Sequence, residues 1–140
     1  MAATENEANL QRALESWNAG NLDGYLELYD ESVTLHGYSP SPMDKTAVRG
    51  FYEAIFEAFD GPQLVFHEVL SAGNRVCIRF TMTGTHRGEF MGVPATDKAI
   101  ALDGITVLRF RKDKCVERWS CADMLGLLVQ IGAIPPPGQE

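Results

Sequence analysis

The chain has 140 residues, of which 45% are hydrophobic, and a formal net charge of −7. A domain of this length buries roughly two thirds of the surface of its unfolded chain, so there is enough apolar material for one core and for a lined cavity. The negative charge disfavours nucleic acid and anionic membrane surfaces as partners. We predict a single domain over residues 1–140 with an irregular tail at about 134–140.

The N-terminus has no basic region followed by an apolar one, so it does not resemble a secretory signal. No stretch reaches the roughly 20 apolar residues that cross a bilayer. The spacing of the three cysteines, Cys77, Cys115 and Cys121, matches no zinc or redox motif, and no two histidines have metal-site spacing. These features predict a cytoplasmic protein with reduced thiols and no metal.

Hydrophobic periodicity predicts three helices in the first 60 residues. The first presents a stripe that ends at Trp17, and Asn21 can cap a short second helix. A short strand over 32–37 follows. Asp44 is a plausible N-cap for the third helix. The amphipathic stripe of that helix consists of Val48, Phe51, Tyr52, Ile55 and Phe59.

The rest of the chain to Asp123 has the alternation of antiparallel strands. The expected strands are 63–71, 74–83, 88–92, 97–111 and 114–122. Asp103-Gly104 is a hairpin signal within the fourth of these. Alternatively, 97–111 is one strand bent at Gly104, which we favour because a hairpin would leave two very short arms.

Three helices followed by a meander of curved strands predict an α+β fold. We expect a cone-shaped, curved antiparallel sheet, an α+β barrel, covered by the three N-terminal helices. Such a cone encloses a hydrophobic cavity, and a cavity of this kind is the default ligand site.

Two groups of residues resemble a known family. The segments from Trp17 to Asp23 and from Leu28 to Val33 resemble the opening of nuclear-transport-factor-2-like proteins. The segment from Gly84 to Pro94, together with Glu117-Arg118-Trp119, Asp123 and Leu125-Gly126-Leu127-Leu128, is more narrowly similar to the SnoaL-like polyketide cyclases.

The resemblance implies a homodimer packed through the outer face of the sheet and no organic cofactor. It also implies an intramolecular aldol cyclisation of a polyketide ester, with an aspartate near the end of the last strand as acid/base. Asp123 matches that aspartate. Arg118 stands where the family often has histidine. The tyrosine and aspartate of ketosteroid isomerases, a sister family, align with Ala13 and Gly37, which disfavours that machinery.

Asp123 lies among apolar residues, and desolvation raises the pKa of a carboxyl group toward the range that suits a general base. The alternative is that Asp123 caps the apolar segment that follows it, and both roles are compatible. His36 lies on the polar side of its strand near the expected cavity mouth and is the candidate assisting donor. The alternative is a half-exposed strand histidine.

Aromatic residues and one further histidine are the candidates for contact with the substrate. Trp17 and Trp119 stand where an element meets the cone, Tyr29 and Tyr52 belong to helical or strand stripes, and His86 shares parity with inward apolar residues. Ordinary core positions are the alternative for all five.

The favoured interpretation is a cyclase- or isomerase-type enzyme that acts on a small hydrophobic carbonyl compound. One alternative is a non-catalytic small-molecule-binding domain of the same fold. Another is an enzyme like the epoxide hydrolases of this fold, which use an Asp-Arg-Asp set.

Overall fold

The protein is described by a computed structural model that covers residues 2–138, with side chains from residue 5 onward. It contains four helices and five strands within that part of the chain. In chain order these are α1 (Ala2–Asn18), α2 (Leu22–Leu26), β1 (Tyr29–His36), α3 (Lys45–Ala58), β2 (Phe59–Ala72), β3 (Arg75–His86), β4 (Ala99–Arg111), β5 (Lys114–Ala122) and α4 (Met124–Gln130).

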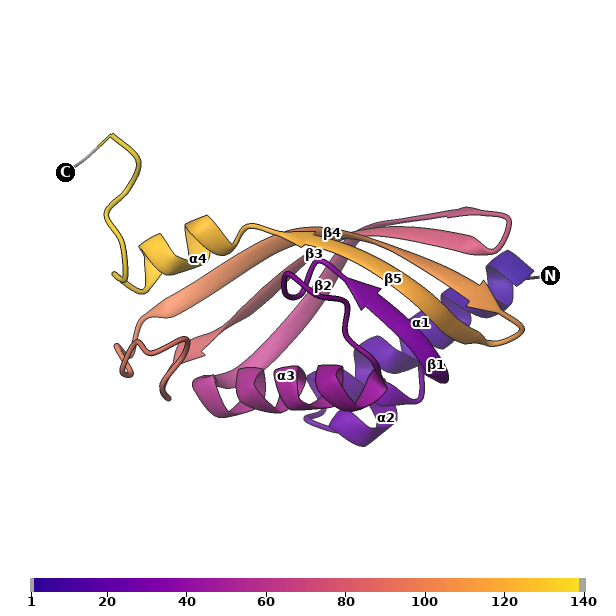
Figure 1. Cartoon of the computed structure of the whole chain (residues 1–140), viewed down its shortest axis with the longest axis horizontal. Helices are drawn as coiled ribbons and strands as arrows, with labels where there is room; N and C mark the ends of the chain where they lie inside the picture. The colour runs from indigo at the N-terminus through magenta and orange to yellow at the C-terminus, as the bar shows by residue number, and fades with distance from the viewer. Residues whose placement is uncertain (1, 139–140) are drawn as a thin grey trace.

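The strands form one curved sheet in the order β1-β5-β4-β3-β2, and α1, α2 and α3 cover its concave face (Figure 1). The α+β class and the helical cover are therefore confirmed. Two details differ from expectation. The sheet is mixed, because β1 pairs with β5 in parallel, and it does not close into a barrel, because β1 and β2 remain its two edges.

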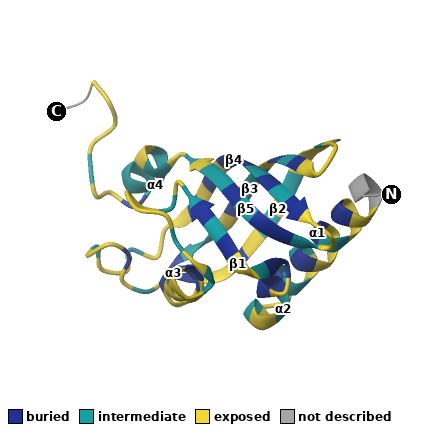
Figure 2. Cartoon of the chain, turned by 45° about the vertical axis from the view of Figure 1, so that its right-hand side comes forward, coloured by how far each residue is buried: buried dark blue, intermediate teal, exposed yellow. Residues whose placement is uncertain are grey.

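Strand β4 shows why the sheet has two distinct faces. From Ile100 to Phe110 every second residue is buried, and the residues between them are more exposed (Figure 2). The preference for one strand over a hairpin is confirmed, and the pairing of β4 with β3 continues through Gly104 without a register shift. Gly104 permits a close contact there, since a Cβ atom at this position would lie 2.5 Å from Cζ of Phe80.

The predicted strand over 88–92 is wrong. Phe90 and Val93 exchange backbone hydrogen bonds of 2.9 and 2.8 Å around a two-residue turn. Met91 and Gly92, the residues of that turn, have φ values of 50° and 81°. Positive φ at two successive residues reverses the chain, so this segment cannot continue as a strand.

The predicted helix caps are confirmed. The side chain of Asn21 accepts the N–H of Gly24 at the start of α2, and the side chain of Asp44 accepts the N–H of Ala47 at the start of α3. Both bonds satisfy donors that a helix leaves open in its first turn. Searching the described residues for a helix long and apolar enough to span a membrane gives none.

Candidate functional site

The concave face carries one buried cation, Arg118, on β5. A register shift between Arg109 and Phe110 of β4 leaves an extra residue on β5, and Cys115 and Val116 are both buried. This bulge changes the phase of the strand, so that Arg118 pairs with the inward Leu35 of β1 and is only 8% exposed. Without the bulge, Glu117 rather than Arg118 would face the helices.

Hydroxyl groups surround the Arg118 guanidinium. Its Nη1 donates to the hydroxyl oxygens of Tyr25 at 2.8 Å and Tyr29 at 2.6 Å, and its Nε donates to Oγ1 of Thr106 at 2.8 Å. Arg118 makes no ion pair with any described residue. A charge removed from water is costly unless it is paired or well hydrogen-bonded, and here the compensation comes from neutral groups alone.

The protonation states of this group follow from burial. Burial raises the pKa of the Tyr29 and Tyr52 hydroxyls well above the ordinary value, in spite of the nearby Arg118 charge, so both phenols are neutral. Burial also raises the pKa of the Cys115 thiol to about 11. For Arg118, burial acts to lower the pKa, but the neighbouring tyrosines, Tyr25 first, act in the opposite direction. The pKa is raised well above its ordinary value, and the guanidinium stays charged.

A chain of hydroxyls leads from Arg118 toward the wider end of the concave face. Tyr29 and Tyr52 share a hydrogen bond of 2.7 Å, and Tyr52 and Tyr38 share one of 2.8 Å. Arg118 can only donate, so Tyr29 accepts from it and keeps its own hydrogen for a further bond. In the Tyr29–Tyr52 and Tyr52–Tyr38 pairs either hydroxyl can be the donor, and one arrangement runs from Tyr29 to Tyr52 to Tyr38. Tyr38 also accepts a long bond of 3.5 Å from Ser120. In the arrangement in which Tyr52 donates to Tyr38, the hydrogen of Tyr38 has no acceptor among the described residues.

The interior thus holds more donors than acceptors. Arg118 uses Nε and Nη1, while its Nη2 makes no hydrogen bond within the described part of the chain. Trp17 is 3% exposed, and its indole Nε1 is buried without a partner. Its ring lies 5.0 Å from that of Tyr25 and 5.3 Å from that of Tyr52, centroid to centroid, so the indole packs directly beside the tyrosine cluster.

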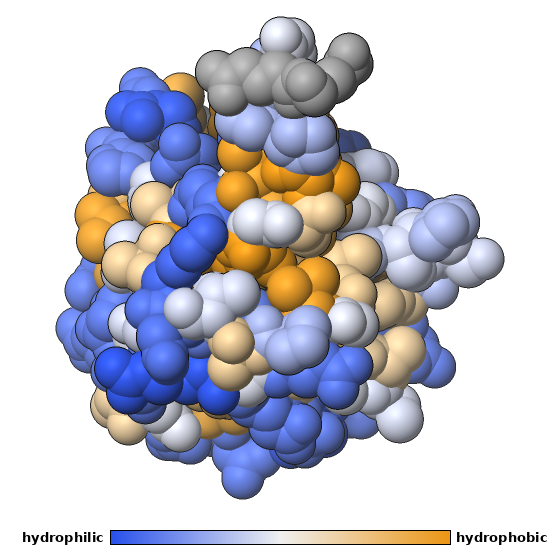
Figure 3. Space-filling view, turned by 90° about the vertical axis from the view of Figure 1, so that its left-hand side faces the viewer, coloured by the Kyte–Doolittle hydropathy of each residue, from blue (hydrophilic) through white to orange (hydrophobic). Residues whose placement is uncertain are grey.

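Hydrophobic side chains line the concave face around these donors, and those toward the wider end are only half-buried. They include Phe66, Phe80, Ala122, Tyr38 and Met43. Figure 3 looks onto the end of the molecule that carries α4 and shows hydrophobic side chains gathered in the middle of that face. These side chains on the concave face are less completely covered than Arg118, which is buried.

Comparison with known proteins adds the family. The family model for SnoaL-like polyketide cyclases matches residues 8–131. This chain belongs to that family. A search of curated proteins finds no match.

Three solved structures show how widely this SnoaL-like fold recurs. AclR of Streptomyces galilaeus, a proposed hydroxylase, has a TM-score of 0.89 and 28% identity over 97% of this chain and 86% of its own. A proposed SnoaL-like polyketide cyclase of Jannaschia sp. CCS1 has a TM-score of 0.83 and 23% identity, covering 94% of both chains. IdmH of Streptomyces antibioticus, a proposed polyketide cyclase, has a TM-score of 0.79 and 25% identity over 91% and 98%.

Asp123, the position of the SnoaL-like acid/base aspartate, is the N-cap of α4. Its Oδ1 accepts the N–H of Gly126 at 2.9 Å, which confirms the capping prediction. Its Oδ2 accepts no hydrogen bond from the residues that the structure describes. Asp123 also borders a shallow pocket of about 420 Å³ together with Thr81 and Asp103, on the side of the sheet away from the helices. Its catalytic role stays a prediction.

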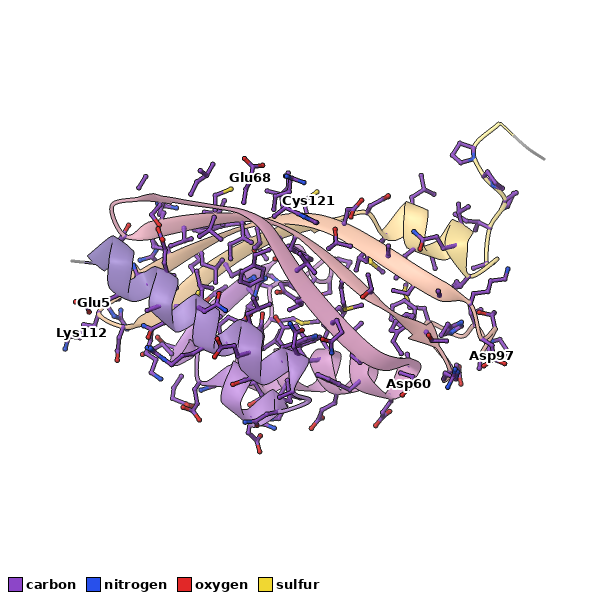
Figure 4. All side chains as sticks on the ribbon, turned by 180° about the vertical axis from the view of Figure 1, so that it is seen from behind. Glu5, Asp60, Glu68, Asp97, Lys112 and Cys121 are labelled. Carbon is purple, nitrogen blue, oxygen red and sulfur yellow. The ribbon has the colours of Figure 1, made fainter. Side chains whose placement is uncertain are left out.

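His36 and Trp119 lie together on the convex face. Their rings stack with centroids 5.6 Å apart, and Nε2 of His36 is 2.8 Å from Oε2 of Glu117. Arg109 donates to the other oxygen of Glu117 at 2.9 Å. The structure therefore does not bring His36 and Trp119 together with the interior donors. Figure 4 shows the same convex side, where Glu68 and Cys121 point away from the helices.

The other predicted contact residues lie inside. Trp17, Tyr29 and Tyr52 all belong to the cluster around Arg118, as described above. His86 is fully buried near the end of β3, where its Nδ1 lies 2.9 Å from Oγ1 of Thr96 and its Nε2 has no partner. Whether any of the four touches a substrate stays a prediction.

Sequence reasoning missed Arg118, Tyr25 and Tyr38 as members of the site. All four tyrosines of the chain take part in the cluster. Tyr25 on α2 and Tyr29 on β1 are only four residues apart in the sequence. That concentration of tyrosine was a usable signal. Searching the described residues for three or more His, Cys, Asp or Glu side chains gathered as metal ligands gives none.

Proposed function

We propose that this SnoaL-like protein is a cyclase- or isomerase-type enzyme that acts on a hydrophobic carbonyl compound by acid/base chemistry. The supporting observation is the donor cluster of Arg118 and the tyrosines inside an apolar concave face. Removing a proton from a carbon next to a carbonyl group places negative charge on the carbonyl oxygen. Fixed donors aimed at that oxygen stabilise the enolate and lower the barrier.

Tyr38 is the natural donor to such an oxygen. Its hydroxyl shares a hydrogen bond with Tyr52, and when Tyr52 is the donor, the hydrogen of Tyr38 has no acceptor in the described part of the chain. The Arg118 charge polarises the hydroxyls between them in one direction, because each bond in a chain strengthens the next. The substrate enters from the open end, with its carbonyl oxygen toward Tyr38.

Asp123 is the proposed base. Its Oδ1 is used as a cap and Oδ2 accepts no hydrogen bond from the described residues, so Oδ2 is the oxygen that would take up a proton. Asp123 borders the pocket on the side of the sheet away from the helices, so its role as base rests on the family resemblance and not on contact with the interior donors. The test is Asp123→Asn, since asparagine caps helices as well as aspartate does but is no base. We expect turnover of a panel of polyketide esters and simpler β-keto esters to fall by about 10²- to 10⁴-fold, the usual contribution of a general base.

A matched control separates chemistry from capping. Asp44 caps α3 with the same kind of hydrogen bond, its Oδ1 accepting the N–H of Ala47, three residues on, at 2.8 Å. Asp44→Asn is expected to leave turnover unchanged. Equal turnover of Asp123→Asn and the wild-type protein would remove Asp123 as the base.

A second candidate function is a non-catalytic small-molecule-binding domain. The observation that favours it is the Asp123 carboxylate turned to the backbone of α4. In that case the wild-type protein binds hydrophobic carbonyl compounds, turns none of them over, and binds them equally after Asp123→Asn. An epoxide-opening enzyme finds less support, because the Asp–Arg–Asp group formed by Asp60, Arg87 and Asp97 is exposed at the surface (Figure 4).

A homodimer through the convex face is part of the proposal. Three large hydrophobic side chains with outward register are exposed on this face: Val65 by 50%, Leu70 by 62% and Ile105 by 51%. A contiguous apolar surface of a few hundred Å² marks an interaction site, and we propose that these side chains form part of one. We expect the molar mass in solution, measured by light scattering, to be that of two chains, and Ile105→Lys to reduce it to one. A monomeric wild-type protein at micromolar concentration would refute this.

A further inference from the structure

We infer that the interior site selects an organic oxyanion, a flat hydrophobic molecule that carries its negative charge on a carboxylate, phenolate or enolate oxygen. The inference rests on the proposed function for the place of the ligand and adds the charge that the ligand brings. The chain has a net charge of −7, yet among the described side chains the one charged group that is buried in the concave face is a cation.

The first argument is the missing counter-charge. Arg118 is 8% exposed, and its hydrogen-bond partners, Tyr25, Tyr29 and Thr106, are all neutral. The nearest carboxylate in sequence, Glu117, points to the opposite face, where His36 and Arg109 hold it. Hydroxyl groups orient their oxygens toward a cation but do not cancel its charge. An anion in the site would be attracted to Arg118 more strongly than it would be attracted to an arginine in water, because the protein interior has a lower dielectric constant than water.

The second argument is the surplus of donors. Among the described residues, hydrogens without an acceptor lie on Nη2 of Arg118, on Nε1 of Trp17 and on the hydroxyl of Tyr25, and also on the hydroxyl of Tyr38 when Tyr52 donates to it. A neutral ligand with equal numbers of donors and acceptors would leave several of them unpaired. An ionised oxygen has only acceptor capacity, and charge-assisted hydrogen bonds to it are about twice as strong as neutral ones.

The third argument is shape. Because Nε and Nη1 are already used, Arg118 offers only the end of its guanidinium group, so the contact is with a single oxygen rather than with a two-oxygen fork. The rest of the ligand lies along half-buried apolar side chains such as Phe66 and Phe80. A hydrophilic anion such as phosphate would lose its hydration there without compensation.

The test compares 2-naphthoate with 2-naphthamide, which has nearly the same shape and no charge. Isothermal titration calorimetry on the full chain at neutral pH should show that naphthoate binds about 10- to 100-fold more tightly, the factor expected for a charged hydrogen bond. Arg118→Met should abolish this preference. Arg75→Met is the matched control, because it removes an arginine that lies over Trp119 on the convex face. It should leave the preference unchanged.

A second measurement needs no variant, in case Arg118→Met fails to fold. 4-Nitrophenol turns yellow on ionisation, and we expect titration with wild-type protein, at a pH near the pKa of the free dye, to raise the absorbance of the phenolate. Equal binding of naphthoate and naphthamide, binding of neither, a preference retained in Arg118→Met, or uptake of the neutral phenol would each overturn the inference.

These outcomes are independent of turnover, since naphthoate and nitrophenol have no reaction to undergo in an acid/base cyclisation. Charge-selective binding without turnover of any ester would sink the proposed function and leave the inference standing. Turnover of neutral esters without a preference for anions would refute the inference and leave the proposed function standing.

Discussion

Removing the hydroxyl of Tyr52 tests the chain of hydroxyls at its centre. The side chain is 5% exposed, and its oxygen lies 2.7 Å from that of Tyr29 and 2.8 Å from that of Tyr38. Tyr52→Phe deletes this one atom and keeps the ring, which packs edge-on against Trp17. Any loss of stability therefore comes from the hydrogen bonds rather than from lost packing.

The magnitude follows from what remains for the two neighbours. A hydrogen bond contributes about 0.5 to 1.5 kcal/mol net, and the cost rises when a buried group is left unpaired. Tyr29 keeps its bond from Arg118, but Tyr38 keeps only the 3.5 Å contact with Ser120. We expect the free energy of unfolding to fall by about 1 to 3 kcal/mol. For a chain of this length that lowers the melting temperature by about 3 to 10 °C.

Urea unfolding followed by tryptophan fluorescence gives the free energies of Tyr52→Phe, Tyr38→Phe and the double variant. Tyr38→Phe loses one strong bond instead of two, so it should cost about half as much. Because both changes delete the same Tyr38–Tyr52 bond, the double variant should cost less than the sum by about 0.5 to 1.5 kcal/mol. Strict additivity, or a Tyr52→Phe protein as stable as the wild type, would refute the connected chain.

Three further predictions concern other parts of the fold. Gly37 has φ of +92°, and a Cβ atom there would lie 1.9 Å from a carbonyl oxygen of β5, so Gly37→Ala should lower the free energy of unfolding by more than about 2 kcal/mol. Gly50→Ala, in open space on α3, should raise it by about 0.5 to 1 kcal/mol. Chemical unfolding of the two variants measures both changes. The hydrogen bond from His36 lowers the pKa of Glu117 from its ordinary 4.5, so the stability that Glu117 contributes is present above 4.5 and lost as the pH falls through the lower, folded value. Glu117→Gln should therefore weaken the decline in melting temperature below pH 4.5, and an unchanged decline would contradict this. Asp123→Ala should lower the free energy of unfolding by about 1 kcal/mol through loss of the cap, with Asp123→Asn close to the wild type.

Periodicity was sufficient to predict α1, α2, α3 and most strands, because each of these elements buries one face and its apolar residues repeat accordingly. Strand β4 is the clearest case, with alternation that continues through Gly104. The parallel pairing of β1 with β5 was not predictable in this way. Spacing in the sequence says which residues share a face, but not which strand lies beside which.

The main cation of the site was missed because of one extra residue. Counting in steps of two from the buried Cys115 places Glu117 inside and Arg118 outside. The bulge at Val116 reverses this and exchanges a carboxylate for a guanidinium on the concave face. Bulges leave little trace in a single sequence, and a charged residue is a poor first guess for an interior. Tyr29 and Tyr52, by contrast, could be assigned to the interior from their apolar stripes.

The pairing of the first strand with the last also has a consequence for biosynthesis. Tyr29 and Cys115 are neighbours in space but more than eighty residues apart in the chain, and contacts of such high order slow folding. While the nascent polypeptide is still on the ribosome, the hydrogen bond from Arg118 to the Tyr29 hydroxyl cannot form until β5 has been synthesised. The native centre of this protein is thus assembled only after translation of β5, and a truncated product would expose its aromatic residues to chaperones and proteases.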